Sequence, residues 1–416
     1  MTLPGQTVQR LDRRTQTNLF LLAACQALGQ ACNTMMFAAT ALSIVTFYPD
    51  RDLATLPVTL QHLGVMLSVF PAALLMQRRG RRVGFRTGSG FGMAGAVVIG
   101  TGLYLANFWI MCLGGLILGY AVASLNQYRF AAVELVAAPW RAKAISWVTA
   151  GGVAAGVIGT SLVRLTHDQW MPIYLATYAA MFAVHATVFV VVSFIRFPAV
   201  PVGTAPAASN THGAAHVPPP RPLFEIATQP RFMAAVIAAM VAFGVMSFLM
   251  SASPLAIVAC GLPHAEAHWV IFLHVMGMFV PAFFTGNLIM RFGTTPVMLA
   301  GIALFGFGVV AGLGGLDAWN FRIALMLNGV GWNFLFVGAT TLVTTCYRPN
   351  ERGKSQAMND FLVFGTTATA SFLAGFLQER LGWFTLNWFS VLLLVVALGA
   401  VGWLWVQERR PASAAA

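Results

Sequence analysis

Apolar residues form long runs along nearly the whole chain, and short polar connectors separate these runs. A helix of roughly 20 apolar residues crosses a hydrocarbon core of about 30 Å, and it satisfies its own backbone hydrogen bonds in lipid. The pattern therefore predicts twelve membrane-spanning helices. Their apolar runs begin near Thr17, Pro57, Thr87, Asn107, Trp140, Trp170, Arg231, Ala267, Thr294, Asn320, Lys354 and Trp383.

The longest polar interruption, residues 197–230, contains three consecutive prolines among small and polar residues. This composition predicts a flexible cytoplasmic linker between an N-terminal half, 1–196, and a C-terminal half, 231–416. The halves also share basic signatures, since the connector after the second helix reads RRGRR and the one after the eighth reads RFG. The sequence therefore predicts an all-α membrane protein of two pseudo-symmetric six-helix halves, an arrangement that gives alternating access to a central site.

Composition and charge agree with this interpretation. Hydrophobic residues make up 58% of the 416 residues and charged residues 9%, whereas about a quarter of the residues in a soluble domain are charged. With a cytoplasmic amino terminus, 20 of the 24 Arg and Lys residues fall in connectors or ends on the inside. The positive-inside rule therefore places both termini in the cytoplasm and explains the net charge of +12 without nucleic acid. No recognisable grouping of nucleophile, base and orienting residue indicates an enzyme.

The basic connectors resemble those of the major facilitator superfamily, whose loop after the second helix typically reads Gly-x-x-x-Asp-Arg-x-Gly-Arg-Arg. The acidic position of that pattern is lost in both halves, where Gln77 and Met290 stand. The resemblance implies a secondary transporter, but the missing carboxylate puts the usual gating contact in doubt. The positions that match the pattern, and that the resemblance implies for gating, are Arg78, Gly80, Arg81, Arg291 and Gly293.

Two residue pairs in the predicted seventh and eighth helices have the spacing of a metal site. Met246 and Met250 are four residues apart, as are His274 and Met278, and residues at i and i+4 share one helix face. Thioether sulfur favours Cu(I), and imidazole also suits copper. Methionine is a common filler of helix contacts, but a histidine in a membrane span is costlier and normally faces the bundle interior or a polar partner.

The order and spacing of these four residues are similar to the signature of the CcoA-like copper importers, a branch of the same superfamily. The resemblance implies import of copper across a bacterial cytoplasmic membrane in support of cytochrome oxidase assembly. Copper is then a transported substrate, no cofactor is expected, and periplasmic or cytoplasmic copper chaperones are candidate partners. Further candidate donors are His62 and Met66, which repeat the HxxxM spacing, and Cys260, which belongs to a hypothetical capture route near the outer end of the seventh helix.

Two other functions stay open at this point. One is import of an organic solute such as riboflavin or another vitamin, because related carriers move such compounds and many aromatic residues here could stack on a ring. The other is a membrane copper chaperone or sensor that transports nothing. Arg129, Glu134 and Asp360 are ionisable groups near predicted helix ends, and the sequence does not decide between an ion route and a structural gate for them.

Overall fold

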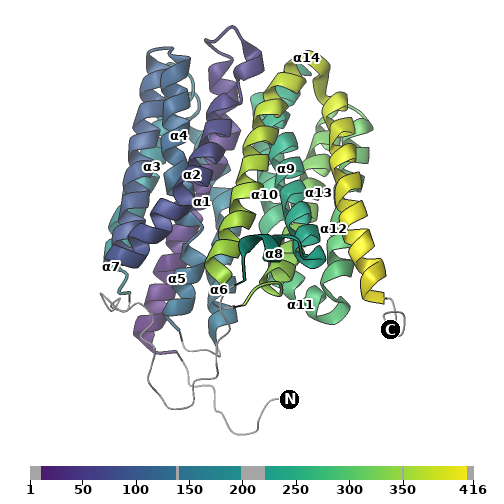
Figure 1. Ribbon diagram of the computed structural model, residues 1–416. Coiled ribbons are helices and arrows are strands. Elements are labelled where there is room, and N and C mark those ends of the chain that lie inside the picture. The colour runs from purple at the N-terminus through teal and green to yellow at the C-terminus, as the bar shows by residue number, and fades with distance from the viewer. Residues whose placement is uncertain (1–10, 137–139, 198–220, 349–350, 410–416) are drawn as a thin grey trace, which may run out of the picture.

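The computed structural model describes residues 11–136, 140–197, 221–348 and 351–409, and within these ranges the regular structure is entirely helical (Figure 1). The described part of the chain contains fourteen α-helices and one short 3₁₀ helix, η1. Their bounds are α1 Arg13–Ile44, η1 Arg51–Leu53, α2 Leu56–Arg79, α3 Arg81–Tyr104, α4 Phe108–Leu125, α5 Tyr128–Glu134, α6 Arg141–Thr166, α7 Leu175–Phe194, α8 Leu223–Ala227, α9 Pro230–Ala259, α10 His264–Phe279, α11 Ala282–Phe292, α12 Thr294–Leu313, α13 Ala318–Thr344 and α14 Arg352–Arg409.

These helices form the twelve predicted membrane spans. Eight stretches are long and apolar enough to cross a membrane, with α14 counted once. Helices α10 and α11 together form a ninth span, which bends by 40° next to Pro281. The long helix α14 is two spans, because Gly382 breaks it with φ +74° and ψ 176°. The 24-residue α3 and the 26-residue α6 complete the set. The predicted all-α, twelve-span fold is confirmed.

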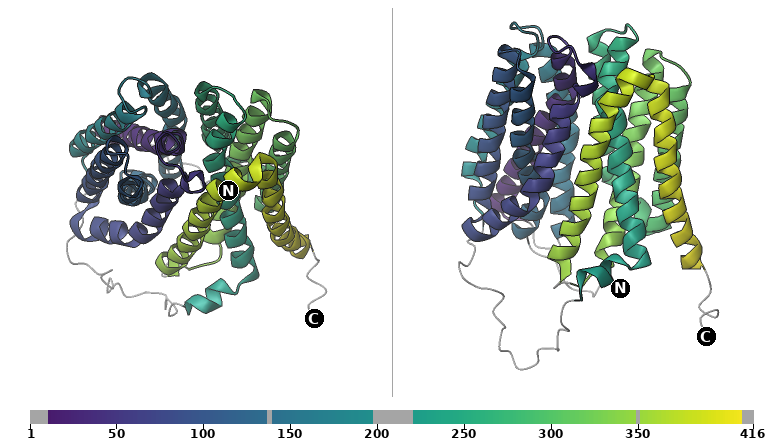
Figure 2. Two further views of the ribbon diagram at one scale, coloured as in Figure 1. Left: turned by 90° about the horizontal axis from the view of Figure 1, so that it is seen from above. Right: turned by 45° about the horizontal axis from the view of Figure 1, so that its top comes forward.

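The spans gather into two bundles that lie side by side (Figure 2), an N bundle made of α1–α7 and a C bundle made of α9–α14. We call the end where α1 begins and α14 ends the base, and the opposite end the top (Figure 1). Of the predicted linker, residues 198–220 lie outside the described residues, and the short helix α8 precedes the C bundle. The exact boundaries of the halves and the cytoplasmic position of the base stay predictions.

Two glycine turns repeat the same backbone conformation in the two bundles. Gly80, between α2 and α3, has φ +86° and ψ 160°, and Gly293, between α11 and α12, has φ +90° and ψ 164°. Glycine adopts positive φ readily because it has no Cβ, so the shared RxG signature has a structural reason. The Arg81 guanidinium then forms an ion pair with Glu134 at 2.6 Å, whereas Arg78 and Arg291 are exposed.

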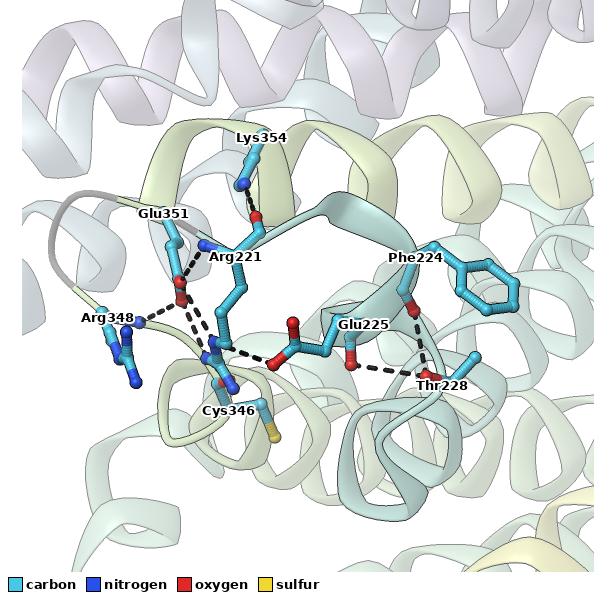
Figure 3. Close-up of polar contacts among 8 residues, drawn as sticks. All are labelled: Arg221, Phe224, Glu225, Thr228, Cys346, Arg348, Glu351 and Lys354. Atoms are coloured by element: carbon cyan, nitrogen blue, oxygen red, sulfur yellow. Dashed lines mark hydrogen bonds and ion pairs between the residues drawn. The ribbon is translucent and has the colours of Figure 1, made fainter. Parts of the chain in front are cut away.

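The segment before α8 is fastened to the loop between α13 and α14 (Figure 3). The Arg221 guanidinium donates to both carboxylate oxygens of the buried Glu351, at 3.0 and 2.8 Å, and the Arg221 backbone N–H donates to the same carboxylate at 2.8 Å. The backbone N–H of Arg348 donates to it at 2.9 Å, and Lys354 Nζ donates to the Arg221 carbonyl. Hydrogen bonding to Arg221 lowers the pKa of Glu351 well below its usual range. The ion pair between Arg221 and Glu351 therefore stays charged at physiological pH.

At the top, polar contacts join the two bundles. The Arg380 guanidinium of α14 lies 2.6 Å from Asp52 in η1, and the Thr55 hydroxyl donates to the Ser371 carbonyl at 2.8 Å. The Tyr174 hydroxyl lies 3.0 Å from His264 Nδ1. These contacts close the top of the seam between the bundles.

Candidate functional site

A cavity of about 420 Å³ lies between the N bundle and the C bundle. Its lining runs from His62 and Met250, in the parts of their helices nearer the top, to Arg129, Thr341 and Asp360 nearer the base. Its volume falls within the range of roughly 300–1,000 Å³ that is usual for small-molecule sites. The cavity is therefore large enough for an organic molecule, and the closed seam lies above it.

The N bundle contributes a wall rich in carboxamides, which we call the amide wall. Three of these side chains lie on α1 at spacings of four and three residues, so they form one polar stripe on a helix that is otherwise largely apolar. Aromatic residues on this side are Phe37 and Phe130. The six carboxamides that line the cavity here are Gln26, Gln30, Asn33, Gln61, Asn126 and Gln127.

The C bundle contributes a wall of six aromatic side chains, which we call the aromatic wall. Trp332 stacks on Phe336 with ring centroids 5.0 Å apart and planes 21° apart. Phe243 meets both rings edge-on, at 5.3 and 4.9 Å. Edge-to-face and offset arrangements are the favoured geometries of aromatic rings, so this wall is an ordered stacking surface. Its members are Phe243, Phe279, Phe283, Trp332, Phe336 and Phe364.

Fixed charge in the cavity is balanced. Among the described lining residues, the side chains that can carry a full charge at neutral pH, histidine aside, are Arg129 on the N bundle and Asp360 on the C bundle. Asn359 Nδ2 donates to Asp360 Oδ1 at 3.1 Å. With one charge of each sign, the lining favours an uncharged solute over an ionic one.

Several polar atoms of the lining are buried without a hydrogen-bond partner among the described residues. They are Gln61 Oε1, Arg129 Nε, Trp332 Nε1 and Asn359 Oδ1. Most buried polar groups in proteins are hydrogen-bonded, so such a concentration on one cavity marks groups that a bound solute or water can satisfy.

The structure places three of the four predicted copper ligands on the cavity. Met246, Met250 and Met278 line it. His274 is fully buried, and its Nδ1 lies 2.9 Å from the Leu325 carbonyl of α13. Because a carbonyl oxygen can only accept, Nδ1 carries the proton and Nε2 keeps a lone pair that meets no described partner. Copper ligation by these four side chains stays a prediction.

The further candidate donors, His62, Met66 and Cys260, lie at different places in the fold. The His62 ring lines the cavity 5.7 Å from the ring of Phe37, whereas Met66 packs at Gly365 of α14. Cys260 follows α9 at the top, where burial raises the pKa of its thiol. Within the described residues, no group of three or more His, Cys, Asp or Glu side chains is placed to hold a metal ion.

Sequence reasoning missed the two walls. The signal for the amide wall was present, because Gln26, Gln30 and Asn33 repeat at helical spacing within an apolar span. The aromatic wall gave no comparable signal, since aromatic residues make up 12% of the chain and occur in most spans. Trp332 and its neighbours become a group only when α9, α10, α13 and α14 pack around them.

Comparisons with known proteins bear on both the fold and the site. The family model described as Major Facilitator Superfamily matches residues 19–263 and 235–416. The riboflavin transporter RfnT of Brucella anthropi is 39% identical over 381 residues, which cover 91% of this chain and 94% of that protein. The uncharacterized transporter YddS of Bacillus subtilis is 26% identical, with 86% and 85% covered.

Solved structures support the fold alone, because their sequence identity is low. A bacterial homologue of the iron transporter ferroportin, in its outward-facing state, has a TM-score of 0.65 at 14% identity and covers 96% of this chain and all of its own. The transporter FucP, in its outward conformation, has a TM-score of 0.62 at 15% identity, with 94% of this chain and 99% of its own covered.

Proposed function

The chain belongs to the Major Facilitator Superfamily, and from that premise we propose that it carries an uncharged, flat organic solute such as riboflavin across the membrane. The family identifies it as a multi-pass membrane transporter rather than an enzyme. The observation that carries the proposal is the cavity of about 420 Å³ with an aromatic wall facing an amide wall. A flavin has a planar ring for the first wall and hydroxyl, carbonyl and N–H groups for the second.

Two further observations support this cargo. The relative that is 39% identical is named a riboflavin transporter, and the two chains match over nearly their whole lengths. The balanced charges of Arg129 and Asp360 suit a neutral molecule such as riboflavin better than a phosphorylated flavin. The organic-solute alternative is therefore better supported than copper, the cargo implied by the MxxxM and HxxxM resemblance.

The closed top indicates how the cycle runs. With the base at the cytoplasm, as the basic residues predict, the described state has its outer seam closed and its cavity reaching toward the inside. Import then requires the bundles to rock, so that the contacts of Asp52, Thr55 and Tyr174 break and the same cavity opens outward.

Copper(I) is the second candidate, and a specific observation favours it. Three thioethers, those of Met246, Met250 and Met278, line one cavity. His274 holds its Nδ1 proton against a backbone carbonyl, which is how metal-binding histidines are commonly oriented. Its free Nε2 is buried, so a change of rotamer or of helix packing must bring it to the methionines before it can bind the same ion.

Uptake by purified protein in sealed proteoliposomes tests the proposal. We expect saturable accumulation of radiolabelled riboflavin that excess unlabelled riboflavin abolishes, and no accumulation of radioactive copper supplied as Cu(I) with a reductant. Empty liposomes are the control. Accumulation of copper without riboflavin would overturn the organic-solute proposal and establish the second candidate. Filling of the lumen also separates a carrier from a membrane copper chaperone, which would bind the ion without transporting it.

A further inference from the structure

Gln61 of the amide wall carries a hydrogen-bonding atom that no described residue satisfies, and the ring of the next residue, His62, lines the same cavity. Both side chains are buried, at 2% and 8% exposed. Gln61 Nε2 donates to Asn33 Oδ1 at 3.2 Å, which fixes the carboxamide and leaves Oε1 as an acceptor without a donor.

The opposite wall offers a complementary group. Trp332 is 7% exposed and its indole N–H, which can only donate, has no described acceptor. The residues that line the cavity therefore include one with an unpaired acceptor on α2 and one with an unpaired donor on α13 among aromatic faces. Leaving such groups unpaired inside a protein is unfavourable, so a cargo that pairs with them is favoured over one that does not.

We propose that Gln61 and His62 recognise the N–H and C=O edge of a planar heterocycle, of the imide or lactam type, while the aromatic wall stacks on its face. This inference rests on the proposed function and names the part of the solute that the protein recognises. An imide N–H donates to Gln61 Oε1, a flanking carbonyl lies beside the His62 ring, and Trp332 contributes its aromatic face. The isoalloxazine ring of riboflavin has such an edge, with one N–H between two carbonyls.

The chemistry disfavours two other kinds of cargo at these positions. A metal ion receives lone pairs from its ligands and offers none, so it cannot accept a hydrogen bond from Trp332 Nε1. A purely apolar ring would stack on Phe336 and Trp332 but would leave Gln61 Oε1 unpaired. A site built to hydrogen-bond one group discriminates strongly against an analogue that lacks it. Replacing the imide hydrogen with a methyl group therefore tests whether the protein recognises this edge.

The experiment compares equilibrium binding of riboflavin and N3-methylriboflavin, in which methylation removes the imide N–H, to the purified protein in lipid nanodiscs. Wild type is expected to bind riboflavin at least about tenfold more tightly, the effect of one well-placed hydrogen bond. Gln61→Leu is expected to lose about tenfold in riboflavin affinity and to bind both flavins alike. Gln61→Glu keeps an acceptor oxygen and is expected to keep the preference, so it tests the inference if the leucine variant does not fold.

Gln378→Leu is the matched control. Gln378 is also buried, at 8% exposed, with an unpaired Oε1 on α14, but it does not line the cavity. Its replacement should leave the preference for riboflavin unchanged. Equal binding of both flavins by wild type, or an unchanged preference in Gln61→Leu, overturns this inference alone. Absence of saturable binding of either flavin overturns the proposed function as well.

Discussion

Two carboxamides on opposite sides of the cavity, Asn333 and Gln61, use their polar atoms in opposite ways. On the aromatic wall, Asn333 Nδ2 donates to the Met278 carbonyl at 2.7 Å, and its Oδ1 accepts from the Thr285 hydroxyl at 2.6 Å. On the amide wall, Gln61 keeps an unpaired Oε1. The C bundle thus uses Asn333 to hold its own helices together, while Gln61 of the N bundle keeps hydrogen-bonding capacity for a solute.

The two bundles share one backbone feature. Both contain the same glycine turn, at Gly80 and Gly293, with nearly identical dihedral angles. Their cavity walls nevertheless differ in side chains, which are carboxamides on one and aromatic rings on the other. If this division is correct, substitutions on the two walls should have separable effects on affinity, stability and selectivity.

The largest expected effect comes from removing the centre of the aromatic wall. Trp332→Ala removes the indole on which the flavin ring is proposed to stack, and loss of one stack between a planar base and an aromatic side chain costs about 1–3 kcal/mol, or roughly 5- to 150-fold in affinity. Isothermal titration of riboflavin should show this loss. Trp332→Phe keeps a ring and should recover most of the affinity.

Trp388→Ala is the control for this prediction, because Trp388 is 61% exposed on α14 and does not line the cavity. Its riboflavin affinity should match wild type. If Trp332→Ala bound riboflavin as tightly as Trp388→Ala, the aromatic wall would have no role in binding.

An intermediate effect, on stability rather than affinity, is expected from Asn333→Leu. The substitution leaves the Met278 carbonyl without its donor and removes the acceptor of the Thr285 hydroxyl, which keeps its bond to the Pro281 carbonyl at 2.8 Å. Unpaired buried groups cost about 1–3 kcal/mol, so the midpoint of thermal unfolding should fall. An unchanged midpoint of thermal unfolding, together with a large loss of riboflavin affinity, would show that Asn333 binds the solute instead.

The smallest effect is expected from the methionines. Met246→Leu combined with Met250→Leu nearly conserves volume, and such exchanges usually cost less than about 1.5 kcal/mol. Riboflavin uptake into proteoliposomes should therefore stay close to wild type. Loss of riboflavin uptake would assign the thioethers to the cargo site, and copper uptake that these substitutions abolish would favour the second candidate.

The fold could be predicted largely from the sequence, because each span is a local pattern. Apolar runs gave the twelve helices, and the RxG signatures marked turns that Gly80 and Gly293 form with positive φ. The site could be predicted in part. Spacing indicated that Met246 and Met250 share a helix face, and both line the cavity.

What spacing could not give is the rotation of each helix against its neighbours. His274 and Met278 are also four residues apart, yet Met278 lines the cavity while His274 meets α13 at Leu325. Nor could the sequence show which of its many aromatic residues would converge, because Phe243, Trp332 and Phe364 come from three helices far apart in the chain. Packing between spans determines both features.

The most direct test of the central claim is a titration of the purified protein against riboflavin, followed by the fluorescence of the flavin itself. Stacking on an indole quenches that fluorescence, so the account predicts saturable quenching by wild type and much weaker quenching by Trp332→Ala. Unquenched riboflavin at every protein concentration, together with Cu(I) binding that depends on Met246 and Met250, would contradict it.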